Sequence, residues 1–188
     1  LIADENDPNS DKDFGKNIIP NMLAAGEKLW PYRFSGYWRD VGTITSLWDA
    51  NMDMLSPTLI NLYDPDWPIS ARSPICPPHY TGEHAEIIHS IVTEGCEIDG
   101  HVENSVLSPS VKVQTGANVC YSVLMPGAVV ESGATVEYAI IGENTVIHSG
   151  AHVGSAPDGS DDWGVATCGP KIEIGSGARV PAGAMIYT

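Results

Sequence analysis

A seventeen-residue repeat runs from Val102 to Val153 and restricts what this chain can fold into more than any other feature. Aliphatic residues recur in three registers at steps of five, six and six, with glycine-alanine pairs between them: Val102, Val119, Val136, Val153; Leu107, Leu124, Ile141; Val113, Val130, Ile147; and Gly116-Ala117, Gly133-Ala134, Gly150-Ala151. Short parallel strands that stack one aliphatic per side toward a common axis need small or positive-φ residues at tight corners. The repeat therefore predicts a mainly β fold, a three-sided parallel β-helix (hexapeptide solenoid). Such coils are usually left-handed, against the right-handed preference of parallel crossovers, although the spacing is compatible with either hand.

The same pattern extends in both directions and predicts a β-helix domain over residues 84–188. Matches lie upstream at a spacing of fifteen and downstream at the six-residue step: Ile91-Val92 and Ile98 with Val106-Leu107 and Val113, then Ile174, Val180 and Ile186. Residues 155–171 fit no turn and are rich in glycine, proline and aspartate, so we expect an inserted loop there. The alternative, an antiparallel sheet, would show polar-apolar alternation and looser spacing.

The first 55 residues do not follow the seventeen-residue repeat, and their sequence pattern predicts a small α/β unit. We expect a helix from about Ile19 to Ala25, strands over 28–34 and 37–43, and an amphipathic helix over 44–55 that Thr43 caps. Six prolines between Pro57 and Pro78 then predict a stiff connector over residues 56–83.

Charge, hydropathy and cysteine content indicate the classes of partner and the compartment that suit this chain. Nine basic residues against 24 acidic ones give a net charge of −15 without any Lys/Arg cluster, which argues against binding to nucleic acid or to an anionic membrane. The sequence has no apolar run of eighteen residues and no cleavable signal pattern, which predicts a cytoplasmic protein. Cys76, Cys96, Cys120 and Cys168 form no CxxC pair, so we expect reduced thiols, with Cys96 and Cys120 packed inside the coils.

Three residues of the first unit are candidates for binding. Asp40 lies between an aromatic strand and a helix start, where a carboxylate can hold a cation or a sugar hydroxyl, or can instead satisfy helix amides. Asp13 precedes the first helix and has the same two interpretations. Trp38 could form an apolar platform for a sugar ring, although a tryptophan is more often part of a core. Residue types and spacing alone leave these alternatives open.

Three segments of the first unit carry more specific motifs: Asp13-Phe14-Gly15-Lys16-Asn17-Ile18-Ile19-Pro20, Gly36-Tyr37-Trp38-Arg39-Asp40-Val41-Gly42-Thr43 and Leu47-Trp48-Asp49-Ala50-Asn51-Met52-Asp53. With these motifs, almost the whole chain resembles the glucose-1-phosphate adenylyltransferases, also called ADP-glucose pyrophosphorylases. Trp-x-Asp-x-Gly-Thr is common to sugar nucleotidyltransferases, whereas Asp-Phe-Gly-Lys and Trp-x-Ala-Asn are particular to the ADP-glucose branch.

The resemblance implies transfer of an adenylyl group from ATP to glucose 1-phosphate, which gives ADP-glucose for glycogen synthesis and pyrophosphate. It implies that Asp40 is one of two aspartates that coordinate Mg²⁺, and that Asp13, Phe14 and Trp38 line the glucose 1-phosphate pocket. The family's glycine-rich phosphate loop, its first metal aspartate and its Glu-Lys-Pro segment are not in these residues. We therefore expect residues 1–55 to be the C-terminal part of the catalytic domain, and this truncated chain to be inactive alone.

Two other functions remain possible from the sequence. A hexapeptide acyltransferase could use His148 or His152 as a base, with coenzyme A along the coil. The β-helix could also serve only assembly and regulation, since the resemblance implies a homotetramer, or a hetero-tetramer with a paralogous subunit, and an effector site between domains. An anionic effector needs cations, and Lys112, Lys171 and Arg179 are those of the β-helix domain; we expect them to be solvated surface charges.

Overall fold

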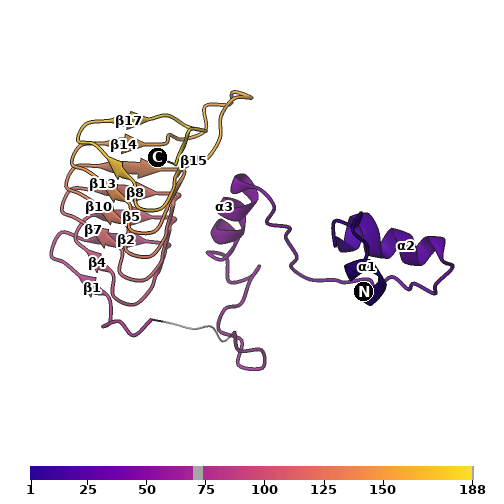
Figure 1. Cartoon of the computed structure of the whole chain (residues 1–188). Coiled ribbons are helices and arrows are strands. Elements are labelled where there is room, and N and C mark those ends of the chain that lie inside the picture. Colours follow the sequence, from indigo (N-terminus) through magenta and orange to yellow (C-terminus); the bar gives the residue numbers. More distant parts are fainter. Residues whose placement is uncertain (70–73, 188) are drawn as a thin grey trace. The chain divides into compact units, whose positions relative to one another are not determined.

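The computed structural model describes residues 1–69 and 74–187, and the chain divides into two compact units, Leu1–Gly36 and Tyr37–Thr188. Most of the second unit is a coil of short parallel strands, drawn in magenta to yellow in Figure 1. Within the described residues, no helix is both long and apolar enough to cross a membrane.

The coil is a parallel β-helix of about six turns with three sheets of six strands each. Sheet A contains β1 (Tyr80–Thr81), β4 (Glu97–Ile98), β7 (Lys112–Val113), β10 (Val129–Val130), β13 (Val146–Ile147) and β16 (Glu173–Ile174). Sheet B contains β2 (Glu86–Ile88), β5 (His101–Glu103), β8 (Asn118–Cys120), β11 (Thr135–Glu137), β14 (His152–Val153) and β17 (Arg179–Val180). Sheet C contains β3 (Ile91–Val92), β6 (Val106–Leu107), β9 (Val123–Leu124), β12 (Ala139–Ile141), β15 (Ala166–Cys168) and β18 (Met185–Ile186).

The strand pairing confirms the predicted registers. Val102 pairs with Val119, and Val136 pairs with Val119 and with Val153. The side chains of these positions are fully buried, as are those of the Leu107 and Val113 registers. Each turn therefore adds about three aliphatic side chains to one continuous core, which contributes roughly 1.5–3 kcal/mol for each side chain before the entropy cost.

The corner between sheets B and C has a repeating backbone conformation. His89, Asn104, Tyr121 and Tyr138 have φ of 42°, 45°, 48° and 48°, a region that non-glycine residues adopt uncommonly. After this corner, a serine hydroxyl accepts the amide of the equivalent residue in the next turn: Ser105 N to Ser90 Oγ, 3.1 Å; Ser122 N to Ser105 Oγ, 3.1 Å; Ala139 N to Ser122 Oγ, 3.2 Å. These bonds satisfy buried amides at the corner.

The predicted loop over 155–171 is wrong at its C-terminal end. Residues 166–168 form β15, and Cys168 pairs with Ile141 and with Ile186. The inserted segment therefore ends near Val165 and lengthens this turn from seventeen to 27 residues, as the pairing of Ile141 with Cys168 shows. The pattern hid this strand because Thr167 and Cys168 occupy the positions that aliphatic residues, Ile140 and Ile141, hold in β12.

The predicted connector also ends earlier than expected, because β1 pairs with β4 and so belongs to the first turn. Residues 70–73 of the connector lie outside the described residues. The β-helix therefore begins at Tyr80 rather than at residue 84.

Residues 1–36 contain α1 (Ile2–Glu5), η1 (Phe14–Ile18), which is one turn of π-helix, and α2 (Ile19–Ala24). The helix predicted from about Ile19 is confirmed as α2, and the π-helical turn directly precedes it. Within this fully described unit, Ile18 is the one buried residue. The strands predicted over 28–34 and 37–43 are wrong: both stretches are irregular, and no described segment pairs with them to satisfy a strand's backbone groups.

The helix predicted over 44–55 is confirmed as α3 (Ile44–Asp53), with a capping box between Thr43 and Ser46. Although its sequence continues the first unit, α3 groups with the β-helix.

Candidate functional site

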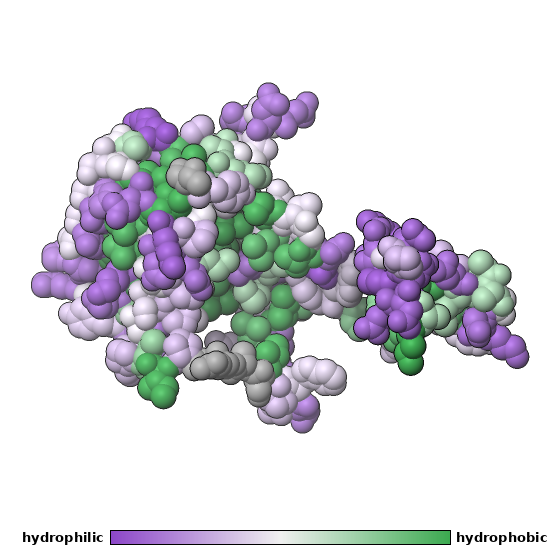
Figure 2. Space-filling view, viewed as in Figure 1, coloured by the Kyte–Doolittle hydropathy of each residue, from purple (hydrophilic) through white to green (hydrophobic). Residues whose placement is uncertain are grey.

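The motif-bearing segment from Tyr37 to Asp53 is attached to the β-helix through α3. Apolar side chains of the helix pack on a second buried cluster outside the coil axis: Ile44, Leu47, Trp48 and Met52 against Val123, Ile140 and Val165, with Met125 and Trp163. In Figure 2, hydrophobic residues gather where α3 lies beside the β-helix, whereas the left side of the β-helix is mainly hydrophilic. The helix is therefore seated by hydrophobic burial.

Aromatic rings from the corner between sheets B and C add to this contact surface. We call the surface of the β-helix on which α3 packs the α3 seat. The indole N–H of Trp48 donates to the backbone carbonyl of Tyr121 at 2.7 Å. The Tyr121 and Tyr138 rings stack with centroids 4.7 Å apart, and Trp163 contacts Tyr138 edge-on at 5.7 Å. We did not identify this seat from the sequence, although the seventeen-residue spacing of Tyr121 and Tyr138 was a signal for it.

Tyr37 and Arg39, which precede α3, bind the acidic side chains of the helix and form a clamp on it. The Arg39 guanidinium lies 3.0 Å from Asp49 Oδ2 and 2.7 Å from Asp53 Oδ2. The Tyr37 hydroxyl donates to Asp53 Oδ2 at 3.0 Å, and partial desolvation together with this carboxylate raises the pKa of Tyr37. Sequence reasoning missed this clamp as well; the two aspartates at an i, i+4 spacing on one helix were the available signal.

Trp38 and Asp40 are exposed residues of the clamped segment. The Trp38 side chain is 75% exposed, and Asp40 is exposed with its Oδ1 close to Gly42, 3.7 Å from where a Cβ would lie. The structure thus leaves both side chains accessible to a ligand. Their roles in sugar and metal binding stay predictions.

Asp13 and Phe14 belong to the other unit and are described separately. Asp13 Oδ1 accepts the Lys16 amide at 2.7 Å, which is the helix-capping arrangement. Phe14, at the start of η1, is 59% exposed. A capping carboxylate keeps a second oxygen, so the cap and a sugar contact are compatible. The predicted sugar contact itself remains untested.

Asp40 fits a magnesium ion as a single carboxylate ligand. Over residues 1–69 and 74–187, the one group of three potential metal ligands is His101, Glu103 and Cys120, which does not include Asp40. Mg²⁺ is commonly held by one or two carboxylates, with substrate phosphates and water as further ligands. An exposed lone carboxylate is consistent with that mode.

The candidate residues His148, His152 and Lys112 face acidic neighbours. His148 lies 3.2 Å from Glu131 and 3.5 Å from Glu173, and hydrogen bonds to these two carboxylates raise its pKa. His152 lies 3.6 Å from Glu137. Lys112 is paired with Glu97 at 2.8 Å, so its charge is already partly compensated. These positions are part of surface ion pairs between turns.

Two of the four cysteines are core residues, and Cys76 and Cys120 are half-buried. Cys96 and Cys168 are fully buried, and burial raises the pKa of Cys168 to about 11. Cys120 was expected to pack inside the coil, but it is half-buried, and its thiol lies near side chains on the outside of sheet B. The expectation failed because the side chains of a strand alternate between the core and the outside, and Val119 occupies the core position.

Two protein-family models match this chain, each over a different part of it. The nucleotidyl transferase family model matches residues 1–57, and the GlmU-like C-terminal hexapeptide model matches residues 78–167. The first match ends close to the boundary at residue 55 that the sequence predicts.

Curated relatives named glucose-1-phosphate adenylyltransferase align with 63% of the chain. The protein of Acetivibrio thermocellus is 51% identical over 120 residues, which cover 28% of its own length. Those of Clostridium perfringens (strain SM101 / Type A) and Fusobacterium nucleatum are 53% and 46% identical over 120 residues, each over 31% of its length. The alignments thus span about three tenths of these relatives. The chain is homologous to glucose-1-phosphate adenylyltransferases, with a nucleotidyltransferase segment followed by a hexapeptide β-helix.

Proposed function

We propose that this chain is part of a glucose-1-phosphate adenylyltransferase, which makes ADP-glucose and pyrophosphate from ATP and glucose 1-phosphate. The observation that carries the proposal is the segment from Tyr37 to Asp53. Its helix α3 packs on the β-helix, Arg39 holds the residues before α3 to the helix, and Trp38 and Asp40 stay exposed. The names of the homologues support the same reaction.

The proposed roles follow from the chemistry of each side chain. Asp40 is a ligand of Mg²⁺, which supplies charge neutralisation at the phosphates when bound. Trp38 and Phe14 offer apolar faces to the sugar ring, and an oxygen of Asp13 accepts a sugar hydroxyl. The clamp of Arg39 on Asp49 and Asp53 restricts the backbone between Trp38 and Asp40, and such positioning is a major part of catalysis by transfer enzymes.

The ATP-binding residues are not among these 188, so we infer that the chain alone does not form ADP-glucose. The β-helix serves as scaffold and assembly surface, in a homotetramer or a hetero-tetramer with a paralogous subunit, and helps to form an effector site. The proposed setting is the cytoplasm, where ADP-glucose serves glycogen synthesis.

A chimeric enzyme tests the reaction. The 188 residues replace the homologous part of the Acetivibrio thermocellus relative, and pyrophosphate release is measured with ATP, Mg²⁺ and glucose 1-phosphate. We expect the chimera to be active and Asp40→Asn to lower kcat about 10²-fold or more, since a charge-neutralising metal ligand is lost. Asp66→Asn, at an exposed connector carboxylate, is the matched control and should keep full activity.

Two results would contradict the proposal. One is a folded chimera in which Asp40→Asn retains the rate of Asp66→Asn. The other is robust ADP-glucose formation by the unfused 188-residue chain, which would show that the ATP site is not missing.

A further inference from the structure

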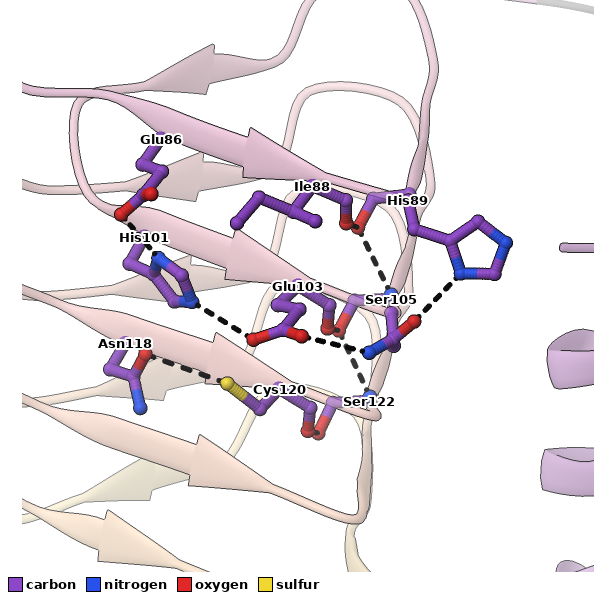
Figure 3. A network of polar contacts seen from close by, with 11 residues as sticks. Glu86, Ile88, His89, His101, Glu103, Ser105, Asn118, Cys120 and Ser122 are labelled. Atoms are coloured by element: carbon purple, nitrogen blue, oxygen red, sulfur yellow. Dashed lines mark hydrogen bonds and ion pairs between the residues drawn. The ribbon is translucent and has the colours of Figure 1, made fainter.

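A group of three chemically different ligand side chains lies on the outer face of sheet B, apart from the segment from Tyr37 to Asp53 (Figure 3). His101, Glu103 and Cys120 each offer one ligand atom, and these three atoms lie within 4.8 Å of one another. His101 and Glu103 are two residues apart on β5, so both point to the same face. Cys120 pairs with Glu103 in the β5–β8 register. Strand register therefore fixes the arrangement.

The orientation of the His101 ring is set from the neighbouring turn. Its Nδ1 lies 3.0 Å from Glu86 Oε2, and its Nε2 lies 3.5 Å from Glu103 Oε2, so both ring nitrogens face carboxylate oxygens. With a cation at Nε2, the imidazole keeps its Nδ1 proton and donates it to Glu86, which is the carboxylate–histidine arrangement that orients imidazole ligands of metals.

The spacing suits a small tetrahedral ion. Zinc–ligand bonds of about 2.0–2.3 Å separate tetrahedral donors by roughly 3.3–3.8 Å. The 3.5 Å between His101 Nε2 and Glu103 Oε2 already matches this separation. Glu103 Oε1 accepts a hydrogen bond from Asn104 Nδ2 at 3.2 Å, which leaves Oε2 for the ion.

The charge around Cys120 also favours a cation. Glu103 and Glu137 are the partners of Cys120 in the strand register, and a Glu103 carboxylate oxygen lies within 4.8 Å of the Cys120 sulfur. The negative charge of these carboxylates attracts a metal ion. On binding, the S–H bond breaks, a sulfur–metal bond forms and the proton leaves to solvent.

We propose that His101 Nε2, Glu103 Oε2 and Cys120 Sγ bind a divalent cation of the zinc class, with Glu86 as the positioning residue and the fourth coordination position open to water. Nitrogen, oxygen and sulfur ligands together suit zinc, whereas Mg²⁺ takes oxygen ligands. The site is independent of the proposed nucleotidyl transfer and of the Mg²⁺ at Asp40.

Titration of the untagged, chelator-treated chain with Co²⁺ tests the site, because a cobalt–thiolate bond gives a charge-transfer absorption in the near ultraviolet. We expect this band to saturate at one Co²⁺ per chain and to be displaced by Zn²⁺. Cys120→Ser should abolish the band, whereas Cys76→Ser, at another half-buried cysteine, should retain it. His101→Asn should weaken binding at least 10-fold. Glu86→Gln should weaken it about 10-fold to 100-fold while the band persists. Far-ultraviolet circular dichroism checks that each variant is folded.

A measurement on the unaltered chain keeps the proposal testable if a variant does not fold. Zn²⁺ should slow alkylation of Cys120 by iodoacetamide at least 10-fold and leave Cys76 unchanged, as read by peptide mass spectrometry. The proposal is overturned if Zn²⁺ does not protect Cys120, or if the cobalt band is absent or survives in folded Cys120→Ser. The cluster is then a set of ion pairs only.

Discussion

The β-helix and residues 1–36 differ in how much of their structure their own residues support. In the β-helix, each turn buries its aliphatic side chains against the turns on either side, and positions such as Leu107, Leu124 and Ile141 are fully buried. In residues 1–36, Ile18 is the one buried side chain, and Phe14, Leu23 and Trp30 are 59%, 60% and 85% exposed. Repetition lets short strands share one core, whereas a unit with a single buried residue has little to hold it together.

The segment from Tyr37 to Asp53 is intermediate between these two regions. It has no core of its own, but the apolar side chains of α3 pack against Val123 and Ile140 on the outer face of sheet C. The candidate residues Trp38 and Asp40 thus depend on the β-helix for their placement. This dependence makes the comparison testable by single substitutions.

The largest effect is expected for a core leucine. Leu124→Ala should lower the free energy of unfolding by about 2–5 kcal/mol, since it leaves a cavity in a fully buried stack. Leu23→Ala, at a position that is 60% exposed in the first unit, is the control and should change it by less than about 0.5 kcal/mol. Urea unfolding followed by circular dichroism measures both. Equal losses would mean that the two regions are supported alike.

The next effect concerns the seat of α3. Trp48→Ala removes the hydrogen bond to Tyr121 and the contact with Tyr138, and should weaken docking of the helix by about 1–3 kcal/mol while the β-helix stays folded. Amide hydrogen exchange of residues 44–53 should then quicken, and that of β8 and β9 should not. Trp67→Ala, at an exposed tryptophan, should alter neither. Unchanged protection of α3 in Trp48→Ala would show that the seat contributes little.

A smaller effect is expected at the helix cap. Thr43→Ala removes the side chain that accepts the Ser46 amide at 3.1 Å, and should cost α3 about 1 kcal/mol. Hydrogen exchange of its first turn reports this loss. Thr58→Ala, outside the helix, is the control. The cap is dispensable if both variants exchange at the same rate.

The smallest effect is a pH dependence at His148. Because its pKa in the folded chain is raised above the ordinary value of about 6.5, its ion pairs with Glu131 and Glu173 stabilise the fold fully below that value. This contribution is lost as the pH rises through the folded pKa. His148→Gln should therefore lower the free energy of unfolding at pH 5.5 and leave it unchanged at pH 9. The control His79→Gln should leave it unchanged at both pH values. An NMR titration that places the His148 pKa at or below 6.5 would refute the assignment.

The core positions of the β-helix were predictable because three buried aliphatic positions recur every seventeen residues. The same logic failed at Cys168, where the core residue is not aliphatic and a ten-residue insertion breaks the spacing. It also failed at Cys120, because a cysteine's preference for burial does not tell which side of a strand it occupies.

The first 55 residues were less predictable for a different reason. Local signals sufficed for the helices, since the caps at Asp13 and Thr43 are made within four residues. They did not suffice for strands over 28–34 and 37–43, because a strand exists only with a neighbour to pair with. The proposed binding roles of Asp13, Phe14, Trp38 and Asp40 come from the resemblance. Local signals made Asp13, Trp38 and Asp40 candidates but left other interpretations open.

Tyr138 lies at a junction of three parts of the chain. Its ring is stacked on Tyr121 and flanked by Trp48 of α3, with centroids 5.8 Å apart, and by Trp163 of the inserted segment. A displacement of Trp163 therefore removes a neighbour from the very ring against which α3 rests. The insertion and the helix that carries Asp49 and Asp53 are thus mechanically connected through one phenol, although they are more than a hundred residues apart in the sequence.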